Sequence, residues 1–343
     1  MTTPTIPQGN KYMDATLYTG TGASLTITNA GGFQPDLVWV KSRSAATDNK
    51  LTDSVRGVTK SLESNTTDAE ATDTQGLTTF GSGGFTVGTN TDYNNSAATY
   101  VGWQWKAGGT AVSNTSGTIT SSVSANTTAG FSIVTYTGTG ANATIGHGLG
   151  IAPKMIIVKC RNTAGESWQV YHSGLTSAAY RIRLNSTDGQ DSQPTMWNST
   201  SPTSSVFSVG TATGTNASTQ TYVAYCWADI DGFSKLGSYT GNGSTDGTFV
   251  YTGFKPKYIL IKRTDTTTYQ WSIWDTTRNT FNAANSNLWA DSTDAETTST
   301  GYDVDILSNG FKLRTTNVAR NASGGTYIYM AFAENPFKYS NAR

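Results

Sequence analysis

Three copies of one repeat run along this chain and constrain its fold more than any other feature. A Tyr-Thr-Gly turn opens each copy, a proline follows 17 residues after the tyrosine, and a lysine follows six residues after the proline. Because three copies keep the same spacings, the chain is a tandem triplication. The repeated positions are Tyr18, Pro35 and Lys41, then Tyr136, Pro153 and Lys159, then Tyr239, Pro256 and Lys262.

Each copy is predicted to fold as a set of β-strands. The runs 37–40, 155–158 and 258–261 are continuously apolar, which predicts a central strand covered on both faces. The segment 99–105 and its two counterparts alternate instead, with apolar side chains on one face. Thr-rich strands and turns rich in Gly and Asn complete the pattern. We predict an all-β chain of three tandem antiparallel β-sandwich modules.

The repeat also sets the expected module boundaries. We expect β-sandwich repeats over residues 1–110, 130–231 and 232–343. The stretch 111–129 consists of small polar residues and is predicted to be a Ser/Thr/Gly-rich linker, with a loose strand as the alternative. Only the short segment 229–237 separates the last two repeats. We therefore expect the first pair of repeats to flex and the second pair to pack as a unit.

Charge and hydropathy exclude several classes of partner. Lys and Arg number 23, as do Asp and Glu, and charged residues make up only 13% of the chain. Such a chain lacks the electrostatic footprint of a nucleic-acid-binding or membrane-surface protein. No apolar run is long enough for a transmembrane helix, and no signal peptide is visible at the N-terminus. Cys160 and Cys226 lie in apolar strands and are predicted to be free buried thiols.

Catalytic motifs are absent from the sequence. It contains no H-E-x-x-H, G-x-S-x-G, P-loop or C-x-x-C pattern, so we expect neither an enzyme nor a cofactor. An Asp-x-x-Arg pattern occurs in two repeats, with His172 at the corresponding place in the middle copy. We predict structural ion pairs at these positions, with a sugar-binding site as the alternative. The pairs are Asp53 with Arg56 and Asp275 with Arg278.

A second repeated pattern places two carboxylates in a polar loop. The first repeat has Asp68 and Glu70, the third has Asp294 and Glu296, and the middle copy replaces the glutamate with Gln190. Carboxylate oxygens suit a hard cation such as calcium or magnesium, so these four residues are candidate metal ligands. The alternatives are a solvated turn and a pair of carboxylates flanking a glycosidic bond.

Tryptophan in polar stretches suggests a binding function. Trp197 and Trp289 lie in polar segments, and Trp168 and Trp271 flank the same region of the repeat. Exposed aromatic rings on the loops of a rigid β scaffold stack on sugar faces, so these four are candidate ligand-binding residues. The alternative is that the rings lock long loops onto the sandwich.

The residues of the first copy carry a family resemblance. The strings "GFQPDLVWVKSRSA", "LESNTTDAEATDTQGLTTFGSGGFTVG" and "TYVGWQWKAG" resemble a tandem-repeat module of tailed-bacteriophage tail-fibre and virion structural proteins, and the ending "YMAFAENPFKYSNAR" is similar to endings in that group. The likeness covers nearly the whole chain and is weakest in copy two. It implies lectin-like or jelly-roll-like sandwiches and a place on the virion surface. It further implies synthesis in the bacterial host cytoplasm without a signal peptide.

Three functions are compatible with that resemblance. The first is a tail-fibre or host-recognition protein that binds host-surface glycan weakly through loop aromatics. The second is a capsid decoration or capsid-fibre protein with a purely architectural role, and the third, a minor alternative, is a polysaccharide-degrading enzyme. The expected partners are other virion proteins, further copies of the chain in a homotrimer and a host glycan; no nucleic acid and no membrane are expected.

Overall fold

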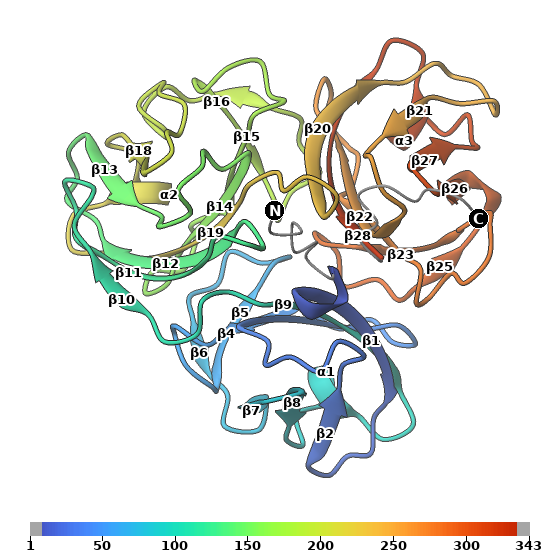
Figure 1. The fold of residues 1–343 in the computed structure, drawn as a ribbon, viewed down its shortest axis with the longest axis horizontal. Coiled ribbons are helices and arrows are strands. Elements are labelled where there is room, and N and C mark those ends of the chain that lie inside the picture. The colour runs from blue at the N-terminus through green and yellow to red at the C-terminus, as the bar shows by residue number, and fades with distance from the viewer. Residues whose placement is uncertain (1–8, 335–343) are drawn as a thin grey trace, which may run out of the picture.

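Three β modules lie around a common centre in the computed structural model, which describes residues 9–334 (Figure 1). Each module has a large sheet, a small sheet of two or three strands and one four-residue α-helix, and all strands pair antiparallel within the sheets. The predicted all-β chain of antiparallel sandwich modules is confirmed. Within the described residues, no helix combines the length and apolar character needed to span a membrane.

In the first module, the last strand inserts between earlier strands of the large sheet. Its elements are η1 (Gly9–Lys11), β1 (Met13–Thr19), β2 (Leu25–Thr28), β3 (Leu37–Ser42), β4 (Lys50–Asp53), β5 (Lys60–Glu63), β6 (Ala71–Thr72), β7 (Leu77–Gly81), β8 (Gly84–Val87), α1 (Thr91–Asn94) and β9 (Thr99–Trp105). The large sheet has the order β1-β9-β3-β4-β5-β6 and the small sheet β2-β8-β7. Strand β9, the last of the module, therefore lies between β1 and β3.

The second module has the same plan with two additional strands at one edge. Its elements are β10 (Val112–Asn114), β11 (Ser121–Asn126), β12 (Phe131–Thr137), β13 (Ala143–Gly146), β14 (Met155–Cys160), β15 (Gln169–His172), β16 (Tyr180–Arg183), β17 (Asp191–Ser192), β18 (Val206–Val209), α2 (Thr213–Asn216) and β19 (Thr221–Trp227). The large sheet has the order β10-β11-β12-β19-β14-β15-β16-β17, and β13 pairs with β18.

The third module returns to the six-stranded plan of the first. Its elements are β20 (Ser234–Thr240), β21 (Phe249–Tyr251), β22 (Pro256–Arg263), β23 (Ser272–Asp275), β24 (Ser286–Trp289), β25 (Thr297–Thr298), η2 (Thr300–Tyr302), β26 (Val304–Leu307), β27 (Gly310–Leu313), α3 (Val318–Asn321) and β28 (Thr326–Ala333). The large sheet has the order β20-β28-β22-β23-β24-β25 and the small sheet β21-β27-β26.

The linker predicted at 111–129 is wrong and the strand alternative is confirmed, because this stretch supplies β10 and β11 of the second module. Val123 of β11 is buried in the interior of that module, and Ile119 pairs with Ile145. A Ser/Thr-rich composition suits a loop and a strand near a sheet edge equally well, so pairing decided the outcome. The flexibility expected between the first two repeats therefore has no linker to support it. Residues 1–8 and 335–343 of the predicted outer modules lie outside the described residues.

The Tyr-Thr-Gly turn is repeated because it packs the first strand against the last. Tyr18 stacks on Tyr100, with ring centroids 5.1 Å apart. A Cβ on Gly20 would lie 2.2 Å from the carbonyl oxygen of Asn95, so the close approach of these two backbone segments requires glycine. The equivalent sets are Tyr136, Tyr222 and Gly138 in the second module and Tyr239, Tyr327 and Gly241 in the third.

A buried asparagine ends the short helix of every module. The Asn94 side chain donates to the carbonyl oxygen of Gly88 at 2.7 Å and accepts from the backbone N–H of Thr21 at 2.8 Å. Asn216 and Asn321 make the equivalent bonds, and all three are fully buried. This side chain satisfies backbone groups of two loops that would otherwise be buried without partners.

The continuously apolar strands are covered on both faces, as predicted. In β3, Val38 and Val40 pack with Phe85 in the interior of the first module. Leu37 and Trp39, which alternate with them, belong to a larger cluster that includes residues of all three modules. One face of the large sheet is thus covered by its own small sheet and the other by the neighbouring modules.

A shared aromatic core lies where the three modules meet. The last aromatic residue of each closing strand points into it, and the Trp105 ring lies 6.2 Å from that of Trp227 and 5.9 Å from that of Phe332. These three residues occupy equivalent positions of β9, β19 and β28. The alternating apolar face predicted for these strands therefore builds the contact between repeats.

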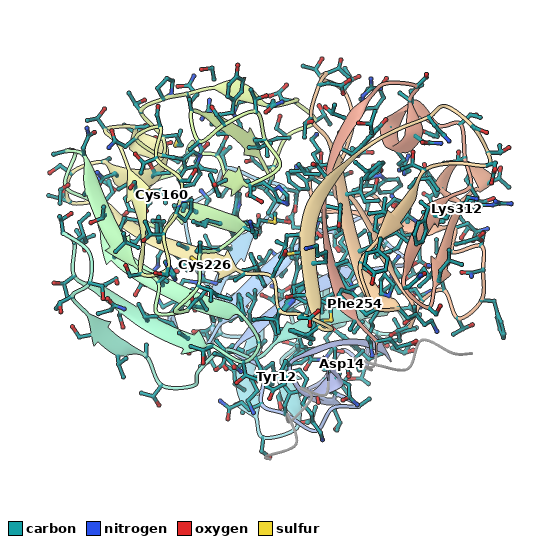
Figure 2. All side chains as sticks on the ribbon, turned by 45° about the horizontal axis from the view of Figure 1, so that its top comes forward. Tyr12, Asp14, Cys160, Cys226, Phe254 and Lys312 are labelled. Atoms are coloured by element: carbon teal, nitrogen blue, oxygen red, sulfur yellow. The ribbon has the colours of Figure 1, made fainter. Side chains whose placement is uncertain are left out.

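The two cysteines lie in the second module, where Figure 2 labels them. Both are free and buried, which confirms the prediction. Burial raises the pKa of the Cys226 thiol to about 12, so this sulfur stays protonated at neutral pH.

Candidate functional site

All the predicted site residues except Trp197 lie at the three junctions between repeats. We define the junction loops as residues 63–70, 183–190 and 289–296, which are equivalent in the three repeats. The first loop bonds the second repeat, the second loop bonds the third, and the third loop bonds the first. Each loop donates a backbone N–H to a backbone carbonyl oxygen of the next repeat. The bonds run from Glu70 to Arg161 at 2.6 Å, from Gln190 to Thr264 at 2.8 Å and from Glu296 to Arg43 at 2.8 Å. The three junctions close the repeats into a ring.

The repeated lysine holds the junction loop of the neighbouring repeat. The Lys159 ammonium is fully buried and donates to the carbonyl oxygens of Thr67 at 3.2 Å and Glu166 at 2.8 Å. Burial lowers the pKa of Lys159 to about 8. The equivalent bonds run from Lys41 to Thr293 and Thr47 and from Lys262 to Ser186 and Tyr269. Spacing identified these lysines, and only the structure showed what they bind.

The first junction binds the candidate metal ligand Glu70 between two arginines. Its carboxylate accepts from Arg161 through two bonds of 2.9 Å and from Arg56 at 3.0 Å. Burial raises the pKa of Glu70, but the hydrogen bonds from Arg161 and the charge of Arg56 outweigh it and lower the pKa below its usual value. Asp68, two residues away, is exposed. This carboxylate pair therefore does not converge on a cation.

The third junction repeats this arrangement. Glu296 accepts from Arg43 at 2.8 and 3.1 Å and from Arg278 at 2.9 Å, while Asp294 is exposed. Within residues 9–334, no group of three or more His, Cys, Asp or Glu side chains could hold a metal ion. The predicted cation site at Asp68, Glu70, Asp294 and Glu296 is wrong, because arginines already occupy the glutamate oxygens.

The middle junction lacks the glutamate–arginine ion pair of the other two. Gln190 stands where the other loops have glutamate, and Thr264 stands where the other repeats have Arg43 and Arg161. Removing one partner of a partly buried ion pair leaves an uncompensated charge, whereas replacing both does not. The glutamine of the second repeat is therefore matched by the threonine of the third repeat, and neither residue leaves an unpaired charge.

The two Asp-x-x-Arg pairs are present and fully buried at the other side of the same junctions. Asp53 accepts from Arg56 Nε at 2.5 Å and from the Tyr225 hydroxyl of the second repeat at 2.7 Å. Asp275 accepts from Arg278 Nε at 2.6 Å and from Trp103 Nε1 of the first repeat at 3.0 Å. Each carboxylate thus bonds its own turn and the neighbouring repeat, with no access for a sugar.

His172 replaces the carboxylate at the junction between the second and third repeats. Its Nδ1 accepts from the backbone N–H of Gly174 at 2.9 Å, so Nε2 carries the hydrogen and donates to the Tyr329 carbonyl oxygen at 3.2 Å. Burial lowers the pKa of this imidazole to about 4. The ring is therefore neutral in the folded protein at neutral pH.

Acidification is expected to weaken the fold through His172. The unfolded imidazole, with a pKa of about 6.5, takes up a proton between pH 6.5 and 4 while the folded one does not, so stability falls as pH falls through this window. From pH 7 to pH 5 this effect amounts to about 2 kcal/mol. Urea denaturation at both pH values should show a flatter dependence for His172→Gln. Equal pH dependence in the two proteins would contradict the assignment, since His147 is present in both.

Two candidate sugar-binding tryptophans hold the junctions. Trp168 Nε1 donates to the Glu63 carbonyl oxygen and Trp271 Nε1 to the Arg183 carbonyl oxygen, both at 2.8 Å. Both rings are buried in the core shared by the repeats. The expectation that they are exposed is wrong, because the junction provides both the apolar cover and the hydrogen-bond acceptor that an indole requires.

The other two candidate tryptophans are also buried. Trp197 packs on Tyr171 inside the second module, and Trp289 packs on Tyr302 in the third. Their exposed fractions are 1% and 6%, so neither ring can stack on a sugar. They lock long loops onto the sandwich, which is the alternative considered for them.

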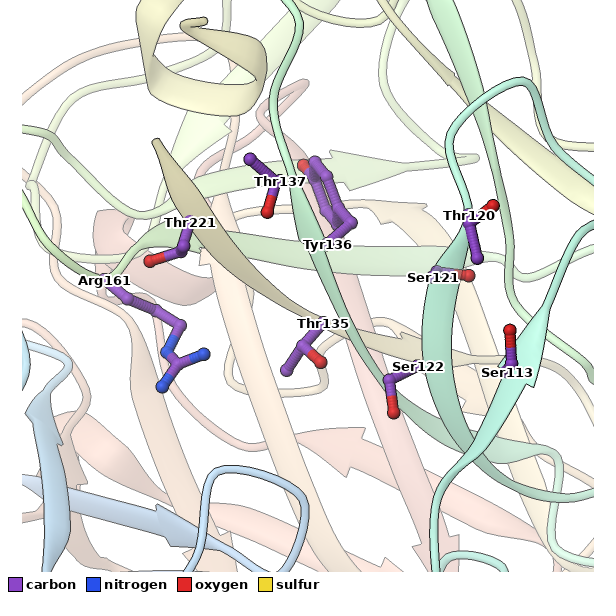
Figure 3. Close-up of a pocket in the computed structure, with 9 residues that line it drawn as sticks. All are labelled: Ser113, Thr120, Ser121, Ser122, Thr135, Tyr136, Thr137, Arg161 and Thr221. Carbon is purple, nitrogen blue, oxygen red and sulfur yellow. The ribbon is translucent and has the colours of Figure 1, made fainter. Parts of the chain in front are cut away.

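An open groove of about 350 Å³ lies on the large sheet of the second module (Figure 3). Hydroxyl side chains from β10, β11, β12 and β19 line it, and the Arg161 guanidinium stands at one end. Arg161 is already bound to Glu70 of the first repeat. The groove thus offers hydroxyl groups but no acid–base pair among its lining residues, which are Ser113, Thr120, Ser121, Ser122, Thr135, Tyr136, Thr137, Arg161 and Thr221.

The exposed aromatic residues are ones that the sequence analysis missed. Phe249 and Tyr251 on β21 are 43% and 62% exposed, and Phe281 is 85% exposed. The available signal was the alternation in "TFVYTG", in which two aromatic residues flank one buried valine. All three residues belong to the third module.

A family comparison treats the three repeats as one unit. The model of the Domain of unknown function (DUF7483) matches residues 8–336, so the chain belongs to that family. This single match spans all three modules and all three junctions. No curated protein matches the chain.

Proposed function

We propose that this member of the DUF7483 family is a structural, non-enzymatic protein of the surface of a tailed-bacteriophage virion. The resemblance of its first repeat to virion structural modules supports this proposal. The family itself is described only as a domain of unknown function and adds no activity.

The closed ring of repeats is the observation that carries the proposal. Most side chains that could have served a ligand bind the neighbouring repeat instead; these are Asp53, Asp275, Glu70, Arg161, Trp168 and Trp271. A ring held by junctions on all sides presents a fixed outer shape, because no module can rotate without breaking two of them. Fixed shape is what a building component of a large particle requires.

An architectural role is preferred here over host recognition. Recognition through Trp168, Trp197, Trp271 and Trp289 would require accessible rings, and these rings are buried. The proposed partners are therefore other virion proteins. The threefold arrangement expected from a homotrimer already exists among the three modules of one chain, so the proposal does not depend on a trimer.

The test is the position of the protein in the particle. Virions produced from the genome that encodes this chain should contain it at a fixed copy number by quantitative mass spectrometry, and cryo-electron microscopy should place the three-module ring on the particle surface. Complete absence from washed particles would overturn the proposal. The isolated chain should release no sugar from host surface polysaccharide; turnover abolished by Glu70→Gln and Glu296→Gln would favour the enzyme alternative.

A further inference from the structure

The small sheet of the third module ends in an exposed aromatic edge strand. Its order is β21-β27-β26, so β21 pairs with β27 on one side only. Val250 points inward and is 5% exposed, whereas Phe249 and Tyr251 point outward and are 43% and 62% exposed. Exposed apolar edge strands are sites at which another strand can add.

The free edge offers the backbone groups of the two aromatic residues. Thr252 N–H donates to the Asn309 carbonyl oxygen at 3.0 Å, and the Thr248 carbonyl oxygen accepts from Leu313 N–H at 3.1 Å. Antiparallel ladders alternate, so the even-numbered residues of β21 bond β27. The N–H and C=O groups of Phe249 and Tyr251 therefore point away from the sheet.

In the second module, the strand equivalent to β21 is β13, and another segment of the chain covers its edge. Thr144 of β13 is equivalent to Phe249, since its neighbour Ile145 pairs with β18 as Val250 pairs with β27. The Thr144 carbonyl oxygen accepts from Ile119 N–H at 3.0 Å, and its N–H donates to Thr118 Oγ1 at 2.8 Å. An extended segment of the chain itself thus completes this edge.

The first module protects the same edge by polarity instead. Thr26 and Thr28 of β2 occupy the places of Phe249 and Tyr251 and are exposed. The aromatic pair is therefore not required by the module fold, which forms twice without it. Of the three equivalent edges, that of β13 is covered by residues 117–119 and that of β2 is lined with threonine. In the described part of the chain, the edge of β21 has neither form of protection.

We propose that β21 binds β21 of a second copy of this chain, antiparallel and about a twofold axis. In this register Phe249 faces Tyr251 of the partner subunit on both sides of the axis, and two three-stranded sheets become one of six strands. The strand is self-complementary in this arrangement because the same two residues supply both halves of each aromatic pair.

Electrostatics permit this self-association. Lys312, which lies opposite Phe249 in the ladder, pairs with Asp246, and the whole chain has no net charge. Figure 2 shows Lys312 at the outer side of the third module, away from the junctions that close the ring. Lys312 therefore brings no unpaired charge to the proposed contact. The contact involves a short strand, so the dimer is weak, with a dissociation constant in the micromolar range or above. It does not depend on the proposed virion role.

Sedimentation of the full chain over a concentration series tests the proposal. We expect the natural chain to form dimers at about 100 µM, and Phe249→Thr with Tyr251→Thr to weaken the dimer at least about tenfold. These threonines copy the first module, so the variant should keep the natural thermal unfolding temperature. Val112→Thr is the matched control, because Val112 is 65% exposed on the edge strand β10, and it should dimerise like the natural chain.

Hydrogen exchange gives a second readout that does not need a variant. The amides of Phe249 and Tyr251 should exchange more slowly as protein concentration rises, while those of Thr26 and Thr28 should not change. A chain that remains monomeric at all concentrations, a dimer that survives the double substitution, or a dimer that Val112→Thr abolishes would each overturn the proposal.

Discussion

Replacing Asp53 with alanine is expected to lower the free energy of unfolding by about 3–5 kcal/mol. The carboxylate is fully buried and accepts from Arg56 and from Tyr225, so its removal leaves a guanidinium and a hydroxyl buried with fewer partners. Urea denaturation followed by tryptophan fluorescence measures the loss.

The control for this prediction is Asp68→Ala on the nearby junction loop. Asp68 is exposed, so its removal should change stability by less than about 0.5 kcal/mol. A loss below about 1 kcal/mol for Asp53→Ala would show that the buried pair contributes little to folding and that Arg56 is satisfied by its other partners.

Trp105→Ala should destabilise the whole chain and not the first repeat alone. The ring is 1% exposed and contacts Trp227 of the second repeat and Phe332 of the third. Truncation opens a cavity in the shared core, at an expected loss of about 3–5 kcal/mol. Because the repeats share this core, calorimetry should show one unfolding transition, in the natural chain and in the variant, with the variant shifted to lower temperature.

The matched control is Phe281→Ala, which removes an aromatic ring that is 85% exposed and should leave the transition in place. Separate transitions, of which Trp105→Ala moves only one, would contradict the shared core. That outcome would mean that each repeat folds as an independent module.

Local features of the fold were predictable from the sequence. The apolar run at 37–40 and the alternation at 99–105 depend on near neighbours in the chain, and both strands lie where these patterns placed them. The Asp53 and Arg56 pair spans three residues, so spacing alone could identify it. The threefold repeat multiplied each such signal, because a pattern seen three times is not accidental.

The candidate site was predictable as positions but not as function. Glu70 and Trp168 were singled out correctly as repeated or unusual residues, yet one was expected to bind a cation and the other a sugar. Their actual partners, Arg161 and Glu63, lie 91 and 105 residues away in the chain. No local pattern records such a pairing.

The sequence by itself determined the module, through hydrophobic periodicity, turn glycines and constant spacing, all of which act within one repeat. Only the tertiary structure decided that three modules close into a ring. The physical reason is that the second face of each large sheet is apolar. An apolar face predicts that it will be buried, but it does not identify the segment that covers it. The neighbouring repeats provide that cover, and their junctions bury the side chains that a linear reading assigns to the surface.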